Sequence, residues 1–242
     1  MRIIVTGAAG QLGKDVVSRL QLDGHTPVPT DISDLDITRK DDVLSFFARA
    51  KADAVIHCAA YTAVDRAEDE PETARRINVN GTWNIAEAAE QYNMKMLYIS
   101  TDYIYPGQGF RPQTEETVPA PCNVYGRTKY DGELASAVCS RLFIVRTSWV
   151  FGHHGANFVQ TMLRLSETHD TLSVVVDQIG SPTFTEDLAP LLCAMIATDT
   201  YGIYNASNEG FCSWYGFARE IFRLSERNVS VLPVSSEFQI HF

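Results

Sequence analysis

The first 150 residues alternate short apolar runs with stretches whose apolar positions recur at helical spacing. The runs are apolar on both faces, as in strands of a parallel sheet that is covered by helices on each side. This alternation predicts βαβ units and an α/β fold, a doubly wound, Rossmann-like parallel sheet. The predicted strands are residues 3–5, 54–56, 96–99 and 143–145, and the predicted apolar helix faces are Leu12, Val16, Val17 and Leu20, then Ile85, Ala88, Ala89 and Tyr92, then Tyr130, Leu134, Ala137 and Val138.

The pattern loosens after Val150, where Gly152-His153-His154-Gly155 indicates a loop. Helices are expected at residues 158–165, 188–196 and 217–224, with a strand at residues 174–176. We therefore predict a dinucleotide-binding domain over residues 1–150 and a smaller C-terminal substrate-binding region over residues 151–242. No linker-like stretch separates them, so the two regions are expected to share an interface.

A glycine-rich turn follows the first predicted strand. Gly7, Gly10 and Gly13 suit a tight turn, a close approach of the backbone to a pyrophosphate, and close packing of helix on strand. Their spacing, GxxGxxG, differs from the commonest dinucleotide fingerprint, GxGxxG, so a purely structural turn is the alternative. Asp31 follows Gly13 by about the distance at which an acid binds the adenosine ribose, although it can also be a plain loop aspartate.

Tyr125 and Lys129 are four residues apart on a predicted helix and therefore share one face. A nearby ammonium favours a phenolate, so this pairing is expected to lower the pKa of Tyr125 and make it a usable acid near neutral pH. Thr101 ends a strand that should be central, and ligands of open α/β sheets lie beyond such strand ends. Without this context, the pair would be a solvated helix face and Thr101 a helix cap.

Composition narrows the function further. The 242 residues carry 20 basic and 30 acidic side chains, a formal charge of −10, which disfavours nucleic acid as a partner. Five scattered cysteines without a CxxC pair indicate reduced thiols and a cytoplasmic protein. No apolar run is long enough for a membrane span. His153 and His154 have no ligand partner at metal-binding spacing, so no metal is predicted.

The glycine loop, the strand-end threonine and the Tyr-x-x-x-Lys pair occur in the order typical of the extended short-chain dehydrogenase/reductases, and the chain resembles that family. Within it, the chain is most similar to reductases of dTDP-linked 4-keto sugars. The resemblance runs from residue 1 to about residue 237. It is carried by Cys58-Ala59-Ala60-Tyr61-Thr62-Ala63-Val64-Asp65, Tyr98-Ile99-Ser100-Thr101-Asp102-Tyr103, Arg146-Thr147-Ser148-Trp149 and Asp177-Gln178-Ile179-Gly180-Ser181-Pro182-Thr183.

The resemblance implies an activity and a role for each matching residue. It implies NAD(P)H-dependent reduction of the 4-keto group of dTDP-4-dehydro-6-deoxy-L-mannose to dTDP-L-rhamnose, a donor for surface polysaccharide. Catalysis would fall to Thr101, Tyr125 and Lys129, and sugar binding to Thr101, Asp102 and Trp149, the last of which can also be a core aromatic. The residues implied to bind the cofactor are Gly7, Gly10, Gln11, Leu12, Gly13, Asp31, Asp36, Ile37, Ala59, Ala60, Tyr61, Tyr125 and Lys129.

Other activities of related proteins remain alternatives. Sugar-nucleotide 4,6-dehydratases carry Asp-Glu after the threonine, whereas this chain has Asp102-Tyr103, which removes a proton-transfer group. A sugar-nucleotide 4-epimerase would hold its cofactor tightly, and a non-catalytic NAD(P)-binding regulatory subunit would need none of the three catalytic residues. The cofactor is expected to be NADPH or NADH, because Asp31 repels a 2′-phosphate while Arg39 and Lys40 offset it.

The C-terminal end departs from the family pattern. The resemblance stops after Glu237, and the last residues, Phe238-Gln239-Ile240-His241-Phe242, match nothing in the segment that follows in relatives. The resemblance implies that some members of the family dimerise through Mg²⁺ held by acidic side chains. Asp15 falls near one such position, but the matching C-terminal acidic residue is absent from this sequence, so no metal is predicted. We therefore expect near-normal NAD(P)H affinity, a weakened dTDP-sugar site, and self-association as a homo-oligomer through exposed apolar side chains.

Overall fold

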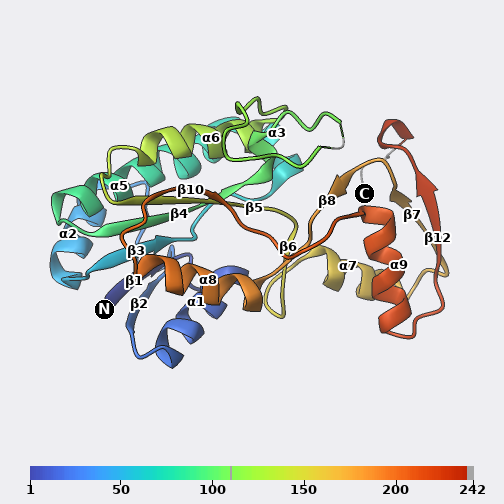
Figure 1. Cartoon of the computed structure of the whole chain (residues 1–242), viewed down its shortest axis with the longest axis horizontal. Coiled ribbons are helices and arrows are strands. Elements are labelled where there is room, and N and C mark those ends of the chain that lie inside the picture. The colour runs from blue at the N-terminus through green and yellow to red at the C-terminus, as the bar shows by residue number, and fades with distance from the viewer. Residues whose placement is uncertain (110, 239–242) are drawn as a thin grey trace.

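A six-stranded parallel sheet forms the larger part of the molecule (Figure 1). The computed structural model describes residues 1–109 and 111–238. The strand order is β10-β5-β4-β3-β1-β2, and all five neighbouring pairs run parallel. The strands are β1 (Arg2–Thr6), β2 (Thr26–Thr30), β3 (Ala54–His57), β4 (Lys95–Thr101), β5 (Leu142–Thr147) and β10 (Gly202–Asn205). The doubly wound α/β fold predicted from the sequence is confirmed.

Burial explains why the central strands were recognisable in the sequence. The side chains of β3 are all buried, and those of β1 are buried after its first residue, as expected for strands with a helix layer on each face. Strand β2 reads Thr-Pro-Val-Pro-Thr and lies at the edge of the sheet. Proline has no N–H to donate to a ladder, so an edge is where two prolines can be accommodated.

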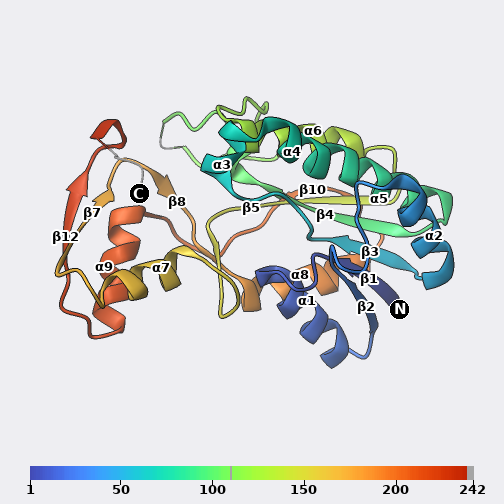
Figure 2. The ribbon, with the colours of Figure 1, turned by 180° about the vertical axis from the view of Figure 1, so that it is seen from behind.

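Helices cover both faces of the sheet, as the two opposite views show (Figures 1 and 2). On one face, α1 (Gln11–Leu22) packs beside α8 (Thr185–Ile196), and their apolar side chains join Ile3, Val5 and Phe143 in one core. On the other face, α2 (Lys40–Ala50), α5 (Thr82–Gln91) and α6 (Val124–Ser136) form the second layer. Before α5 come the short helices α3 (Val64–Asp69) and α4 (Pro71–Arg75) and a π-helix over Arg76–Gly81.

The apolar face predicted for the third helix is wrong. Leu134 is 58% exposed and Val138 is 37% exposed, while Ala137 also faces solvent. The buried face of α6 instead carries Gly126, Thr128, Lys129, Gly132 and Glu133. This helix packs its small and charged residues inward, so the spacing of apolar residues indicated the helix but not its orientation.

The smaller C-terminal part has its own core. Strands β7 (Thr171–Val175) and β12 (Ser230–Val234) pair in parallel, and α7 (Phe158–Leu165) and α9 (Trp214–Leu224) pack against each other. Their buried residues are Met162, Val174, Ala218, Ile221 and Phe222. The three helices and the strand expected after residue 150 are all present, within a few residues of the predicted bounds.

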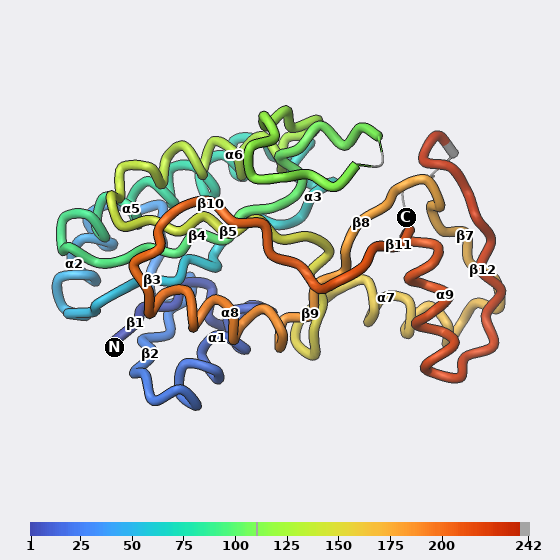
Figure 3. Tube along the Cα trace, viewed as in Figure 1, coloured from blue at the N-terminus to red at the C-terminus, as the bar shows by residue number. Residues whose placement is uncertain are grey.

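The chain crosses between the two parts three times, as the tube trace shows (Figure 3). At the junction, β6 (Val150–Phe151) pairs with β9 (Thr183–Phe184), and β8 (Ile179–Gly180) pairs with β11 (Cys212–Ser213). After β9 the chain returns to the sheet to form α8 and β10. The division into residues 1–150 and 151–242 stays a prediction, and residues 185–205 pack with the sheet. Residues 239–242, part of the segment expected to depart from the family pattern, lie outside the described residues.

No helix in the described ranges is both long enough and apolar enough to cross a bilayer.

Candidate active site

The turn between β1 and α1 requires glycine at two positions. Gly7 has a φ of +64°, and a Cβ there would lie 2.8 Å from the Cα of Ala59. A Cβ on Gly13 would lie 2.1 Å from the carbonyl oxygen of Gly7, well inside contact distance. The glycine turn therefore packs tightly against α1 and against the segment after β3 that contains Ala59 and Ala60.

The N-terminus of α1 is suited to bind an anion. Gly10 is its N-cap, no side chain caps the helix, and its first turn has no acidic residue. Backbone N–H groups and the positive end of the helix dipole are therefore available to a phosphate. Together with a turn that excludes Cβ atoms, this end of the helix fits a dinucleotide pyrophosphate.

Asp31 lies beside the glycine loop, directly after β2. Its Oδ2 accepts a hydrogen bond from the Ala9 N–H at 2.9 Å, and its Oδ1 accepts one from the Ile32 N–H at 2.8 Å. Five residues on, Asp36 accepts from the Thr38 hydroxyl at 2.7 Å, and this hydrogen bond lowers the pKa of Asp36.

Ile37 is buried against Gly81, where a Cβ would come within 2.7 Å of its side chain. The adenosine contacts expected of Asp31, Asp36 and Ile37 stay predictions, and the structure gathers the three near the same end of the sheet.

A segment from the junction covers the start of α1. Gln11 donates from Nε2 to the Val150 carbonyl at 3.2 Å, and Asn157 donates from Nδ2 to Gln11 Oε1 at 2.7 Å. His153 and His154 lie in this segment as loop residues, as predicted. Their Nε2 atoms lie 3.5 Å from Glu186 and 3.6 Å from Asp15, and the described residues contain no group of three metal-ligating side chains.

The three residues with expected catalytic roles meet at the carboxyl end of β4. Thr101 ends β4 opposite Thr147 of β5, which confirms its predicted position at a central strand end. Asn123 caps α6 by accepting from the Gly126 N–H at 2.7 Å, so Tyr125 lies in the first turn of the helix. A Cβ on Gly126 would lie 2.2 Å from the Tyr103 carbonyl oxygen. This close contact brings the helix start against the strand end.

The side chains of Asp102 and Tyr103 lie at this strand end beside Tyr125. The Thr101 hydroxyl donates to Asp102 Oδ1 at 3.1 Å, and the ring of Tyr103 packs edge-on against Tyr125 with centroids 5.5 Å apart. Burial raises the pKa of Asp102 to about 6. The side chain is therefore a carboxylate at neutral pH but titrates just below it.

The lowered pKa expected for Tyr125 is wrong in direction, and Lys129 is not among the groups that shift it. Burial raises the pKa of Tyr125 well above its ordinary value, with smaller contributions from Asp102 and Tyr103, whereas the Thr101 hydroxyl acts to lower it. The phenol is therefore protonated at neutral pH, which is the form that a proton donor needs.

Lys129 is almost completely buried, with 3% of its surface exposed. Its Nζ donates to the Ile99 carbonyl at 2.6 Å and lies 4.2 Å from the centre of the Tyr98 ring. Burial lowers the pKa of Lys129 to about 7, because the charged form loses its hydration. Its protonation state is therefore sensitive to neighbouring charges.

A buried hydrogen-bond chain that sequence reasoning missed runs beneath the site. The hydroxyl of Thr82 donates to the Asn78 carbonyl, so His57 must donate from Nε2 to Thr82 at 3.2 Å. Its Nδ1 is then the acceptor for the Thr6 hydroxyl at 2.6 Å. Burial lowers the pKa of His57 to about 3, which keeps the ring neutral.

Asn78, in the π-helix, continues this chain toward the expected cofactor and catalytic residues. Its Oδ1 accepts from the Tyr61 N–H at 2.8 Å, and its Nδ2 donates to the Tyr61 carbonyl and to the Thr128 hydroxyl, each at 3.1 Å. Thr128 in turn donates to the Tyr125 carbonyl at 3.0 Å. π-Helical turns are frequent at functional sites, but apolar periodicity carries no sign of them.

Trp149 adopts a conformation that is rare for a bulky residue. Its φ is +46°, in the left-handed region, which marks strain that the surroundings must maintain. Its ring stacks on Trp214 with centroids 3.5 Å apart, and a Cβ on Gly180 would lie 2.5 Å from the indole. Trp149 follows Thr147, the last residue of β5, by two positions, so this clamped ring lies just beyond the carboxyl end of that strand.

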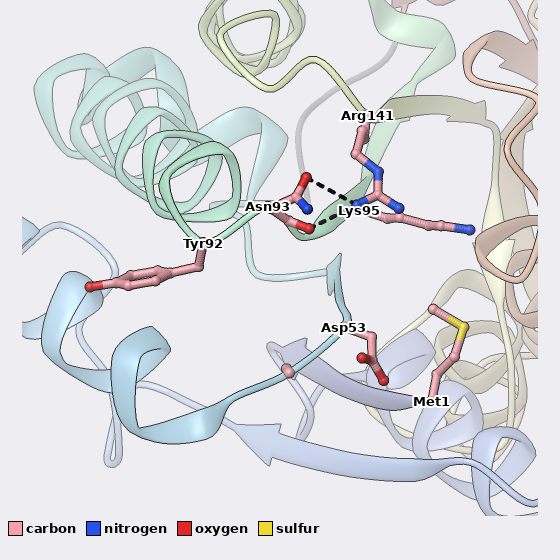
Figure 4. Close-up of a pocket in the computed structure, with 7 residues that line it drawn as sticks. Met1, Asp53, Tyr92, Asn93, Lys95 and Arg141 are labelled. Atoms are coloured by element: carbon pink, nitrogen blue, oxygen red, sulfur yellow. Dashed lines mark hydrogen bonds between the residues drawn. The ribbon is translucent and has the colours of Figure 1, made fainter.

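A separate hollow of about 540 Å³ opens at the amino ends of the strands (Figure 4). Its cations already have partners: Lys95 Nζ donates to the Thr198 carbonyl at 2.6 Å, and Arg141 Nη1 donates to the Asn93 carbonyl at 2.8 Å. Ligands of such sheets bind at the opposite, carboxyl end. The lining residues are Met1, Ala52, Asp53, Tyr92, Asn93, Lys95 and Arg141.

Comparison with known proteins identifies the family to which this arrangement corresponds. The family described as RmlD substrate binding domain matches residues 1–240. The chain belongs to this family. It is 43% identical over 229 residues to the dTDP-4-dehydrorhamnose reductase of Aggregatibacter actinomycetemcomitans, covering 91% of this chain and 78% of that protein. It is 39% identical to the spore coat polysaccharide biosynthesis protein SpsK of Bacillus subtilis, covering 98% of this chain and 83% of that protein.

Solved structures of family members share the whole described fold. The dTDP-4-dehydrorhamnose reductase of Bacillus anthracis, in complex with NADP, matches with a TM-score of 0.94 and 45% identity, over 98% of this chain and 85% of that one. The Clostridium acetobutylicum reductase matches with a TM-score of 0.96 and 44% identity, over 99% and 86%. The UDP-glucose 4-epimerase of Thermus thermophilus, solved with NAD, is only 22% identical, so that likeness concerns the fold alone.

Proposed function

We propose that this protein is a dTDP-4-dehydrorhamnose reductase that uses NADPH or NADH in the cytoplasm. The observation that supports this most directly is the meeting of Thr101, Tyr125 and Lys129 at the carboxyl end of β4, in a chain 43% identical to a reductase of that name. The turn around Gly7 and Gly13, which no side chain can enter, supports dinucleotide binding, as does the NADP complex of the Bacillus anthracis relative.

Cofactor binding is assigned to the residues around the glycine turn. Gly10, Gln11 and Leu12 at the start of α1 bind the pyrophosphate through backbone N–H groups. Asp31, Asp36 and Ile37 border the adenosine. Ala59, Ala60 and Tyr61 follow β3 along the cofactor, and Asn78 fixes the Tyr61 backbone there.

The reduction itself needs a hydride and a proton. When bound, NAD(P)H supplies the hydride. The phenol of Tyr125, protonated at neutral pH, donates its proton to the developing alkoxide oxygen, while the Thr101 hydroxyl holds the same oxygen by a hydrogen bond. Lys129 holds the cofactor ribose from the next turn of the helix. Asp102 and Trp149 contact the sugar nucleotide from either side of the strand ends.

A direct assay tests the proposal. The protein, mixed with NADPH and dTDP-4-dehydrorhamnose, should oxidise the cofactor, which is followed by its absorbance. Tyr125→Phe should lower kcat by roughly 10²-fold or more while leaving the NADPH dissociation constant nearly unchanged. The matched control is Tyr130→Phe, five residues further along the same helix, which should have no such effect. Folded wild-type protein that oxidises no cofactor would refute the assignment.

Two other outcomes have distinct signatures. A 4-epimerase would be purified with tightly bound NAD and would show no net oxidation. A regulatory subunit would bind the cofactor without turnover and would retain a partner protein in stoichiometric amount. The homo-oligomer expected from the sequence stays a prediction, and sedimentation analysis would measure it.

A further inference from the structure

A buried ion pair lies one helical turn beyond Lys129. The side chains of Glu133 and Arg146 are only 4% and 3% exposed. The guanidinium donates twice to the carboxylate, from Nε to Oε1 at 3.0 Å and from Nη2 to Oε2 at 2.8 Å, and the Ser100 hydroxyl donates to the same Oε1 at 2.5 Å. Glu133 accepts all three of these hydrogen bonds, two from Arg146 and one from Ser100, as a carboxylate does.

The other side of the guanidinium holds the connection between β4 and α6. Arg146 donates from Nη1 to the Tyr105 hydroxyl at 3.1 Å and to the Glu115 carbonyl at 3.2 Å. The Tyr105 hydroxyl donates to Asn205 Oδ1 of β10 at 2.7 Å. Tyr105 comes directly after the turn that begins at Asp102, so the ion pair links the catalytic helix to the segment expected to meet the sugar.

Glu133 is the anion that opposes the effect of burial on Lys129. It acts to keep the lysine protonated. The other titratable groups facing the ammonium are uncharged near neutral pH. These are His57, whose pKa burial lowers to about 3, Cys58, whose pKa burial raises to about 12, and Tyr98, whose pKa burial raises further.

A buried ion pair of this kind adds little to the free energy of unfolding. Removing two charges from water costs several kcal/mol for each ion, and well-packed apolar replacements are often as stable. The pair is built on α6 and β5, the two elements that carry Lys129 and the strand end beside Thr101.

We propose that Glu133, held by Arg146 one helical turn from Lys129 on the buried face of α6, is a positioning residue that keeps the ammonium of Lys129 charged in the active site. A catalytic role for this charge rests on the proposed function, but the charge of Lys129 can be measured without turnover. The chain has five lysines, so the Lys129 signal can be resolved by NMR of protein labelled at the lysine side chains and assigned with a Lys129→Met variant.

Glu133→Gln should lower the pKa of Lys129 by about one pH unit, because the amide no longer stabilises the ammonium. Where turnover is measured, the alkaline limb of kcat/KM should move to lower pH by the same amount, since the charged form exists below the pKa. The matched control is Asp131→Asn, on the same helix, which removes the exposed pair with Arg75 and should leave the Lys129 titration unchanged.

Glu133→Gln also leaves Arg146 buried without its partner, so the variant can unfold. The double variant Glu133→Gln, Arg146→Met removes both charges and should recover most of the stability while Lys129 still titrates at the lower pH. A wild-type titration of Lys129 in the single or the double variant would overturn the proposal and leave the pair a structural one. Wild-type protein without turnover, but with a shifted Lys129 titration in the variants, would refute the proposed function and not this role.

Discussion

His57 should make the protein sensitive to mild acid. The imidazole is 1% exposed and its pKa is lowered by burial to about 3, against an ordinary value of 6.5. In the unfolded chain the ring takes up a proton below pH 6.5, whereas the folded protein resists protonation until about pH 3. Protonation therefore favours the unfolded state, and stability falls as the pH drops from 6.5 toward 3. At pH 4.5 the loss from this one residue is about 2.7 kcal/mol, from two pH units at roughly 1.36 kcal/mol each.

The variant His57→Gln isolates this effect. Glutamine has an amide N–H that can donate to Thr82 and an amide oxygen that can accept from Thr6, in place of Nε2 and Nδ1, and it does not titrate. Urea unfolding of both proteins at pH 7.5 and pH 4.5 gives the change in free energy of unfolding for each. The variant should be somewhat less stable at pH 7.5 but should lose about 2.7 kcal/mol less on acidification.

Other groups do not obscure the comparison. Burial raises the pKa of Asp102 to about 6, so this carboxyl takes up its proton earlier in the folded protein and acts in the opposite direction, stabilising it as the pH falls. Asp102 is present in both proteins, so its contribution cancels in the difference. An equal loss of stability in both proteins would refute the reasoning and would mean that the ring is already hydrated in the folded state.

Two further predictions concern the cofactor. Gly13→Ala places a Cβ 2.1 Å from the Gly7 carbonyl oxygen, so the turn must open, and we expect a loss of about 1–3 kcal/mol in stability together with weaker NAD(P)H binding. Thermal unfolding and a cofactor titration would measure both, and an unchanged dissociation constant would separate this turn from the cofactor. Because Asp31 disfavours a 2′-phosphate while the cations Arg39 and Lys40 follow it in the sequence and can offset that effect, kcat/KM for NADH and NADPH should differ by less than about a hundredfold, roughly 2.7 kcal/mol. Strict dependence on NADPH in steady-state assays would show that Asp31 does not border the ribose.

The central strands of the sheet were predictable because each is marked by its own run of apolar residues. Strands covered on both faces must be apolar throughout, so runs such as residues 3–5 and 96–99 are recognisable without knowledge of their neighbours. A polar residue that ends such a run, as Thr101 does, then lies at the carboxyl end of the parallel strands. The glycine turn was predictable for the same reason. It lies between the first strand and the first helix, where the chain must turn tightly and the helix must pack closely on the strand.

The inward face of α6 was not predictable in the same way. Leu134 fits a helical apolar pattern but faces solvent, while Lys129 and Glu133 are buried because Tyr98, Ser100 and Arg146 come from other strands to meet them. The direction of the Tyr125 pKa shift depends on the same packing. Spacing along one helix indicated which side chains are neighbours, but not how little water surrounds them.

The hydrogen-bond chain through His57 and Asn78 was missed for a related reason. Its members come from β1, β3, the π-helix, α5 and α6, and none of them forms a motif in its own segment. Each side chain is an ordinary polar residue until the fold brings it to a partner.

The three crossings between the two parts determine how the parts can be exchanged between relatives. The C-terminal part is formed by two separate stretches, one between β6 and β9 and one after β10, with α8 and β10 returned to the sheet between them. A chimera that joins one relative's first 150 residues to another's remainder would mix α8 with a foreign α1 and β10 with a foreign β5. Recombination that keeps the sheet intact needs crossover points near residues 151, 183 and 206, so that the C-terminal part is transplanted as a pair of insertions.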